Sequence, residues 1–184
     1  MKQTIIGSTI LLSMLALLAV FPLSAGLLGE KAHALDAPAN RLDPWFLKGE
    51  TAPAVLVYFG YVGCTSICIP ALNEITPLYR KIQRQAHGVP FYFVNLNPTQ
   101  DREWVEPFAR SFHPDFKGVY ADIGQVNRLE KDFNLAITGE EEMSHSSNLY
   151  LMVRNGSAYE LKRIYATHPY HEASVLDDIQ RYTR

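Results

Sequence analysis

Two cysteines, Cys64 and Cys68, are the residues of this sequence whose type and spacing most directly suggest chemistry. They are the only cysteines among its 184 residues, and they lie four positions apart. A disulfide that closes so short a loop restrains the unfolded chain very little, so the pair is poorly placed for stabilisation. Two sulfur atoms one turn apart can instead form a reversible disulfide or bind one soft metal ion, such as Cu(I) or Zn(II). The sequence therefore predicts a paired thiol site for redox chemistry or metal binding.

Histidine is the residue type best suited to complete such a metal site, because neutral imidazole binds copper and zinc well. The chain has six histidines, at positions 33, 87, 113, 145, 168 and 171. His168 and His171 flank Pro169-Tyr170 before the last predicted helix, where they could cap the helix or bind a ligand. His145 lies just before an apolar strand segment. Spacing alone does not choose among them.

A buried strand and a helix are the elements that must position the cysteines. Residues 54–59 form a continuous apolar run between Pro53 and Gly60, which predicts a strand covered on both faces. Apolar residues then recur with helical spacing at positions 67, 71, 75, 78 and 82. We therefore expect Cys64 at the strand-to-helix turn and Cys68 one turn into the helix. Ligands in α/β proteins bind at this end of a strand, which argues against two cysteines that merely fill the core.

The position of Cys64 also predicts its protonation state. The amino terminus of a helix stabilises a thiolate relative to a thiol. We therefore expect the pKa of Cys64 to lie below that of an ordinary cysteine.

The remaining pattern predicts an α/β fold, with a mostly parallel central sheet, an antiparallel edge hairpin and flanking helices. Pro77 predicts a kink in the helix that follows the cysteines. The other expected elements are a buried strand at 91–94, a helix at 101–112, a helix capped by Asp122 and Gln125 that runs to Phe133, a hairpin of 149–153 and 159–165 around Asn155-Gly156, and a closing helix that contains Val175, Leu176 and Ile179.

The amino-terminal residues predict export from the cytoplasm. No charged residue occurs between Lys2 and Glu30, and Ala32-His33-Ala34 offers small residues for cleavage. We expect a signal peptide or membrane signal-anchor at 1–34, a tether at 35–46 and one domain at 47–184, on the periplasmic or extracytoplasmic side. The formal net charge of −2, with no basic stripe, gives no reason to expect a nucleic-acid partner. We expect the domain to be a monomer.

Four segments of the chain resemble the Sco family (Sco/SenC). Residues 57–70 resemble the family pattern Tyr-Phe-Gly-Tyr-Thr-x-Cys-Pro-x-x-Cys-Pro, and residues 95–101 resemble its Ser-Val-Asp-Pro-x-Arg-Asp segment. Residues 112–116 resemble Tyr-His-Pro-x-Phe, and residues 144–151 resemble Asp-His-Ser/Thr-x-x-x-Tyr-Leu. The segments occur in the family's order over residues 47–183.

The resemblance implies a thioredoxin-like copper protein. In the Sco family the two cysteines and the distal histidine bind copper, which carries over to Cys64, Cys68 and His145. It implies Cu(I) or Cu(II) as the metal and the copper-site subunit of cytochrome c oxidase as the acceptor. Four departures from the pattern bear on the site: Thr65 and Ile69 replace prolines, and Asn97 and Ser144 replace acidic residues.

Two other functions remain open on the sequence. In a thiol–disulfide oxidoreductase, Cys64 would attack a disulfide of a periplasmic partner and Cys68 would resolve the mixed disulfide. The loss of the acidic residues also fits a membrane-tethered interaction domain whose site has decayed. The wider Cys-x-x-x-Cys spacing favours metal binding, and we expect copper delivery to be the main role.

Overall fold

A mixed seven-stranded sheet forms the centre of the protein, in a computed structural model that describes residues 34–36, 41–86, 88–135, 147–166 and 168–183. The strand order is β1-β7-β6-β3-β4-β5, and β2 also pairs with β7. The strands are β1 (Leu35–Asp36), β2 (Arg41–Leu42), β3 (Ala54–Gly60), β4 (Phe91–Asn95), β5 (Phe116–Tyr120), β6 (Leu149–Asn155) and β7 (Ala158–Tyr165).

The sheet has a parallel half and an antiparallel half. Strands β3, β4 and β5 pair in parallel, whereas β6 and β7 continue the sheet in antiparallel pairing from β3. The hairpin predicted around Asn155-Gly156 is confirmed as β6 and β7, and Gly156 has a positive φ of 66°. The fold class is confirmed, and the antiparallel part is larger than expected because β1 and β2 add to β7.

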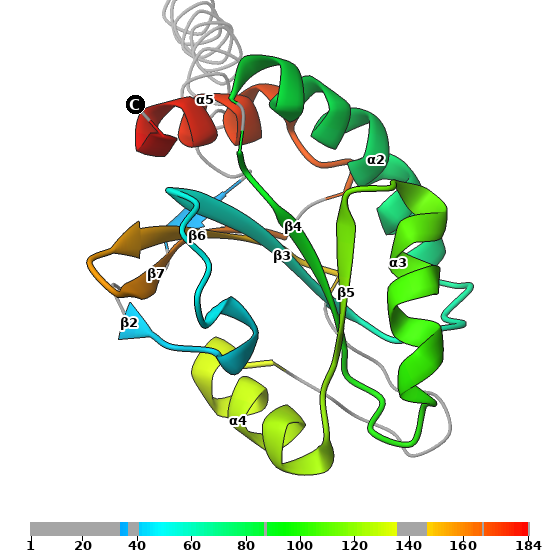
Figure 1. Ribbon diagram of the computed structural model, residues 1–184. Coiled ribbons are helices and arrows are strands. Elements are labelled where there is room, and N and C mark those ends of the chain that lie inside the picture. Colours follow the sequence, from blue (N-terminus) through cyan, green and yellow to red (C-terminus); the bar gives the residue numbers. More distant parts are fainter. Residues whose placement is uncertain (1–33, 37–40, 87, 136–146, 167, 184) are drawn as a thin grey trace, which may run out of the picture. The chain divides into compact units, whose positions relative to one another are not determined.

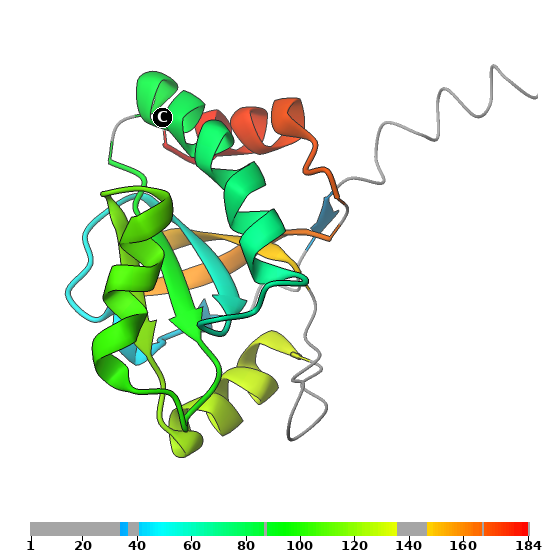
Figure 2. The same ribbon diagram turned by 90° about the vertical axis from the view of Figure 1, so that its right-hand side faces the viewer.

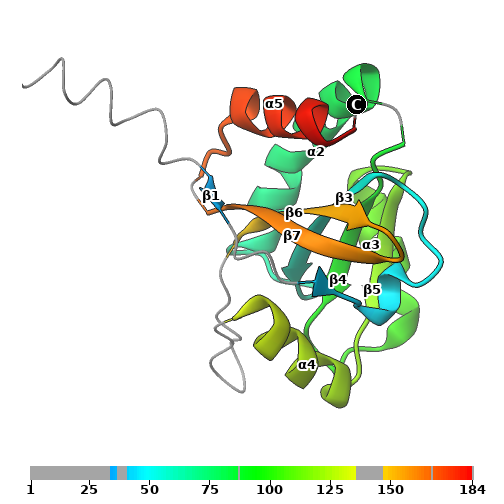
Figure 3. The same ribbon diagram turned by 90° about the vertical axis from the view of Figure 1, so that its left-hand side faces the viewer.

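Helices cover both faces of the sheet, as the sequence predicts. Figure 1 shows α2 (Cys68–Gln85), α3 (Val105–Phe112) and α5 (Glu172–Thr183), whose buried side chains share one core. Figures 2 and 3 show α4 (Ile123–Phe133) on the opposite side of the sheet from α2 and α5. The predicted capping box forms, since Asp122 accepts from the Gln125 N–H and the Gln125 side chain accepts from the Asp122 N–H.

Strand β3 supports the site from the middle of the sheet. All seven of its residues are buried between β4 and β6. Its side chains alternate between two cores: Leu56 and Tyr58 pack with α2, whereas Val57 and Phe59 pack with α4. Burial on both faces explains why this strand has a continuous apolar run rather than alternating polar residues.

Several elements differ from the prediction. Strand β5 was not predicted, because residues 116–120 include Lys117 and Gly118 and lack an apolar run. The stretch expected to be a tether contributes β1 and β2, both pairing with β7, whereas a short element at its end, the 3-10 helix η1 (Trp45–Leu47), agrees with the sequence. A second 3-10 helix, η2 (Arg102–Trp104), begins the segment predicted as one helix.

The amino-terminal residues 1–33 lie outside the described residues. The prediction of a leader therefore rests on the sequence. Among the helices that the structure describes, none combines the length and apolarity needed to cross a membrane.

Candidate thiol and metal site

The two cysteines lie between the end of β3 and the start of α2. Cys64 sits in the intervening turn, and Cys68 is the first residue of α2 rather than one turn into it. Pro70, which has no N–H to donate, lies in the first turn of α2, where that N–H would have no acceptor within the helix. Both cysteines are free thiols and are buried. The Cys68 N–H points at the Cys64 Sγ, with 3.4 Å between the nitrogen and the sulfur.

The two thiols differ in their protonation. Burial raises the pKa of Cys68 to about 12, and the neighbouring Cys64 sulfur adds to that effect. Burial also acts to raise the pKa of Cys64, but hydrogen bonds outweigh it and lower this pKa below the ordinary value. These bonds come first from the backbone and thiol of Cys68 and then from the Ile67 backbone. The predicted depression of the Cys64 pKa is confirmed.

Gly60, the last residue of β3, leaves room for the Cys68 sulfur. A Cβ atom at this position would lie 2.8 Å from the Cys68 Sγ and 3.0 Å from a ring carbon of Phe93. The Gly60 carbonyl accepts from the Leu96 N–H at 2.7 Å, which joins the ends of β3 and β4. Any side chain at residue 60 would therefore have to displace the sulfur.

Asn95 holds the loops that follow β3 and β4 together. Its fully buried side chain accepts from the Val62 N–H at 3.2 Å and donates to the Asn97 carbonyl at 2.7 Å. The Asn97 side chain in turn accepts from the backbone N–H and the hydroxyl of Thr99. Asn97, which stands where the family pattern has an acidic residue, thus stabilises the turn after β4 through these hydrogen bonds.

A second group of residues approaches Cys68 from the start of β6. The Tyr58 hydroxyl hydrogen-bonds with the Cys68 sulfur and lies 3.3 Å from the Ser147 Oγ. The Ser147 carbonyl accepts from the Tyr170 hydroxyl at 2.9 Å and lies 2.7 Å from His168 Nε2. Ser147 comes directly after residues 136–146, which lie outside the described part of the chain.

The histidines have different outcomes. His145 lies outside the described residues, as do His33 and His87, so its predicted role as a ligand stays a prediction. His113 packs edge-on against Tyr79, with ring centroids 5.1 Å apart. His171 caps α5 through its Nδ1, which accepts from the Ser174 N–H at 3.3 Å. Within the described residues, no group of three or more His, Cys, Asp or Glu side chains could hold a metal ion.

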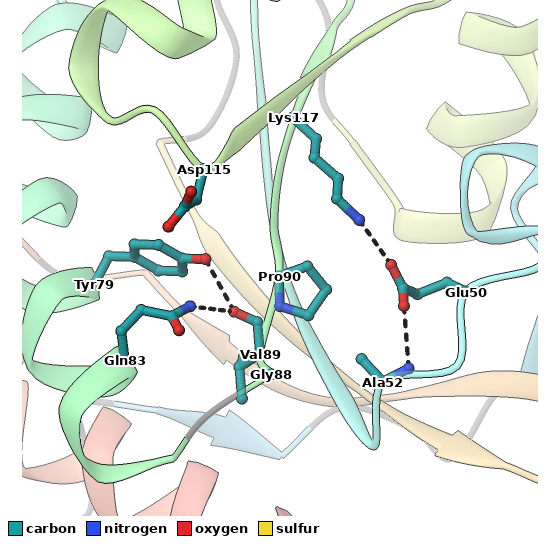
Figure 4. A pocket seen from close by; sticks show the side chains of 9 residues that line it. All are labelled: Glu50, Ala52, Tyr79, Gln83, Gly88, Val89, Pro90, Asp115 and Lys117. Atoms are coloured by element: carbon teal, nitrogen blue, oxygen red, sulfur yellow. Dashed lines mark hydrogen bonds and ion pairs between the residues drawn. The ribbon is translucent and has the colours of Figure 1, made fainter.

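Two surface hollows lie away from the cysteines. One, of about 320 Å³, opens between Glu50, Tyr79 and Lys117 (Figure 4). Figure 4 shows that Lys117 pairs with Glu50, at 2.9 Å, and that Tyr79 and Gln83 both direct their polar groups to the Val89 carbonyl. The other hollow, of about 500 Å³, lies beside Trp45. Neither hollow has a cysteine in its lining. The thiol pair is therefore separate from both hollows, and it is the best-supported site for chemistry.

The arrangement supports two kinds of chemistry. Two adjacent sulfurs are soft ligands that suit Cu(I). The same thiols form an unequal pair, in which Cys64 is the more easily ionised. Sequence reasoning found both cysteines but missed four supporting residues, Tyr58, Gly60, Asn95 and Ser147. The sequence signal that could have indicated these four residues was their position in the segments that resemble the Sco family.

Comparison with known proteins gives one family. The SCO1/SenC family model matches residues 47–184. A "SCO2-like protein" of Rickettsia felis is 27% identical over 119 residues, which cover 60% of this chain and 57% of that protein. This chain therefore spans a little over half the length of that relative.

Solved structures give the same fold. A SCO1/SenC family lipoprotein from Bacillus anthracis superposes with a TM-score of 0.65 at 15% identity, over 81% of this chain and 95% of the other. Arabidopsis thaliana ScoI, solved with copper bound, superposes with a TM-score of 0.64 at 19% identity, over 80% of this chain and 96% of the other. At these identities the likeness confirms the fold, including its thioredoxin-like character.

Proposed function

This chain belongs to the SCO1/SenC family, and from that membership we propose that it binds copper through Cys64, Cys68 and His145. The copper is cargo, delivered to the copper-site subunit of cytochrome c oxidase during its assembly. Two thiolates and a neutral imidazole suit Cu(I), and an added ligand would accommodate Cu(II). The structure of Arabidopsis thaliana ScoI with copper bound supports the choice of metal.

One observation carries the inclusion of His145. Ser147 hydrogen-bonds with Tyr58, and Tyr58 hydrogen-bonds with the Cys68 sulfur. His145 is two residues from Ser147, a separation that an extended chain spans in about 7 Å. The described structure therefore brings the chain within reach of Cys68 at a point two residues from this histidine, as the proposal requires.

The proposed location is the extracytoplasmic side of a membrane. The uncharged stretch between Lys2 and Glu30 supports export, and the Bacillus anthracis relative is described as a lipoprotein. We place residues 1–34 as signal peptide or signal-anchor, residues 35–46 as a tether that pairs with the sheet through β1 and β2, and residues 47–184 as the functional domain. Free thiols in an oxidising compartment require a reductant or a bound metal to protect them.

A copper titration of the full chain under reducing, anaerobic conditions tests this function. We expect about one copper per chain, and we expect the affinity to fall in Cys64→Ser, Cys68→Ser and His145→Ala because each removes a ligand. His171→Ala is the matched control, since this histidine caps α5 and should leave copper binding unchanged. Full retention of copper in all three ligand variants would contradict the proposal.

The unequal thiol pair supports a second candidate, a thiol–disulfide oxidoreductase. The Cys64 thiolate would attack a disulfide of a periplasmic partner and release one of its thiols. Cys68 would then displace the second thiol, leaving the partner reduced and Cys64 and Cys68 joined by a disulfide. Copper-free protein that reduces a disulfide peptide at undiminished rate in His145→Ala would favour this function over copper delivery.

A further inference from the structure

A polar network beside the thiol pair joins α2 to the chain segments on either side of the hairpin. Glu74, in α2, accepts from the Tyr170 N–H through Oε1, and its Oε2 lies 3.1 Å from His168 Nδ1. His168 Nε2 lies 2.7 Å from the Ser147 carbonyl, which also accepts from the Tyr170 hydroxyl at 2.9 Å. His168 and Tyr170 thus both contact Ser147, and Glu74 of α2 holds the two of them in place.

His168 is held through both of its ring nitrogens. Each ring nitrogen faces an oxygen atom, the Glu74 carboxylate on one side and the Ser147 carbonyl on the other. The ring also packs against Tyr170, with centroids 4.3 Å apart. His168 therefore holds a definite orientation although it is partly exposed.

Ser147 links this network to the thiol pair. Its Oγ lies 3.3 Å from the Tyr58 hydroxyl, which also hydrogen-bonds with the Cys68 sulfur. Burial raises the pKa of Tyr58 well above its ordinary value, so its hydroxyl stays a donor. The carbonyl and the hydroxyl of Ser147 are thus both held, from opposite sides, at one end of β6.

We propose that Glu74, His168 and Tyr170 are positioning residues of the copper site. They act through Ser147, which they fix beside Tyr58, and so they hold the Tyr58 hydroxyl on the sulfur of the ligand Cys68. The inference rests on the proposed function, which it deepens by naming what positions this sulfur ligand. Groups that orient a metal ligand without touching the metal typically change affinity 10–100-fold when removed.

Glu74 offers a variant that breaks the network and one that keeps it. Glu74→Ala removes the partner of both His168 and the Tyr170 N–H. In Glu74→Gln, the amide oxygen can still accept from Tyr170, and the amide nitrogen can donate to His168 Nδ1. The neutral ring would then carry its proton on Nε2 and still donate to Ser147.

The experiment measures copper affinity of the full chain in these variants. We expect Glu74→Ala and His168→Ala to bind copper about 10-fold or more weakly than wild type at unchanged stoichiometry, and Glu74→Gln to recover most of the loss. Lys81→Ala is the matched control, because it breaks an exposed ion pair of 2.6 Å between α2 and Glu172 of α5 without touching Ser147. It should bind copper like wild type.

A metal-free measurement separates this inference from the proposed function. The backbone resonances of Ser147 and Asn148 should shift in Glu74→Ala and stay in place in Lys81→Ala and Glu74→Gln. If wild type binds copper through His145 while Glu74→Ala and His168→Ala bind it equally well, the positioning role is overturned and the function stands. If wild type binds no copper, both fall. Should Glu74→Ala fail to fold, Tyr170→Phe, which removes one donor to Ser147, makes the same test.

Discussion

Cys64 and Cys68 are neighbours with opposite shifts in pKa, and that difference follows from where each sulfur lies. The Cys64 sulfur receives the first N–H of α2, whereas the Cys68 sulfur lies in the core beneath Tyr58. A thiolate is the nucleophile, so the two residues should react at different rates. The site therefore combines one thiol, Cys64, that ionises readily with another, Cys68, that keeps its proton until its sulfur binds a metal ion or forms a disulfide.

Alkylation of the copper-free, reduced protein tests this inequality. The pKa of Cys64 is lowered and that of Cys68 is about 12, so near neutral pH Cys64 carries the larger thiolate fraction. We expect iodoacetamide to modify Cys64 first, and its rate to reach a plateau at lower pH than that of Cys68. Peptide mass spectrometry over a pH series would measure both rates. Equal rates throughout the series would contradict the assignment.

Gly60 is the residue where a single methyl group should disturb the site. In Gly60→Ala the new Cβ meets the Cys68 Sγ at 2.8 Å, so the sulfur or the strand must move. We expect a loss of about 1–3 kcal/mol in the free energy of unfolding, measured in urea, and faster alkylation of Cys68. Gly124→Ala is the control. Gly124 lies in α4, and a Cβ atom there would meet only the Asp122 carboxylate, at the ordinary contact distance of 3.4 Å. It should leave stability unchanged or slightly increased. Equal effects in the two variants would remove this role for Gly60.

At the scale of elements, the loops after β3 and β4 and the start of β6 form the surroundings of the thiols. Asn95 joins the two loops, and Tyr58 joins β3 to Ser147, two residues before β6. The opposite end of the sheet has its own brace. There Glu50, which precedes β3, binds Tyr92 of β4 at 2.5 Å and Lys117 of β5 at 2.9 Å.

The Glu50 brace predicts a pH-dependent stability. Burial acts to raise the pKa of Glu50, but bonds from Tyr92, Lys117 and the backbone lower it to about 2. A carboxylate with a lowered folded-state pKa stabilises the protein above its unfolded-state pKa of about 4.5 and loses that effect as pH falls toward 2. Glu50→Gln should therefore cost about 1–3 kcal/mol near neutral pH and progressively less in acid.

Urea unfolding of wild type and Glu50→Gln at neutral pH and near pH 3 measures this difference. Asp177→Asn, which breaks an exposed pair with Arg181 in α5, is the control and should have little effect at either pH. A cost of Glu50→Gln that stays constant into acid would show that the carboxylate charge is not what stabilises the brace.

The sequence was most informative where burial and local chemistry act together. The apolar run at 54–59 predicted β3, because a strand buried on both faces needs apolar residues at every position. The Asp122 capping box predicted the start of α4, because its contacts lie within one helical turn. Strand β5 was missed because α3 covers Gly118 and the Glu106 carboxylate accepts its N–H, contacts that no local pattern reveals. The network around Ser147 was missed for the same reason, since its members are far apart in sequence.

Some residues of the candidate site could also be predicted from the sequence, and others could not. The cysteine pair and the lowered pKa of Cys64 follow from a strand-to-helix turn, which the sequence predicts, whereas the raised pKa of Cys68 follows from its burial, which was not predicted. His145 came only from the resemblance to the Sco family, because spacing did not choose among six histidines. Tyr58 and Glu74 could not be assigned to the site beforehand, since a strand tyrosine and a helix glutamate have many ordinary roles.

In the molecule as a whole, the thiol pair and the stabilising contacts of Glu50 lie at different ends of the sheet. The thiol pair lies where β3 ends and α2 begins, at the carboxyl end of the parallel strands. Glu50 and the hollow beside it lie at the other end, before β3 and β4 begin. In the described residues the thiol pair and the Glu50 brace thus lie at opposite ends of the sheet, and the proposed copper binding and thiol exchange would compete for the same two sulfurs.

X-ray absorption spectroscopy of the copper-loaded full chain tests the central claim most directly, because it counts the sulfur and imidazole ligands of the bound copper. The account predicts two sulfur ligands and one imidazole in wild type, one sulfur fewer in Cys64→Ser or Cys68→Ser, and no imidazole in His145→Ala. A wild-type spectrum with fewer than two sulfurs, or an imidazole that persists in His145→Ala, would contradict it.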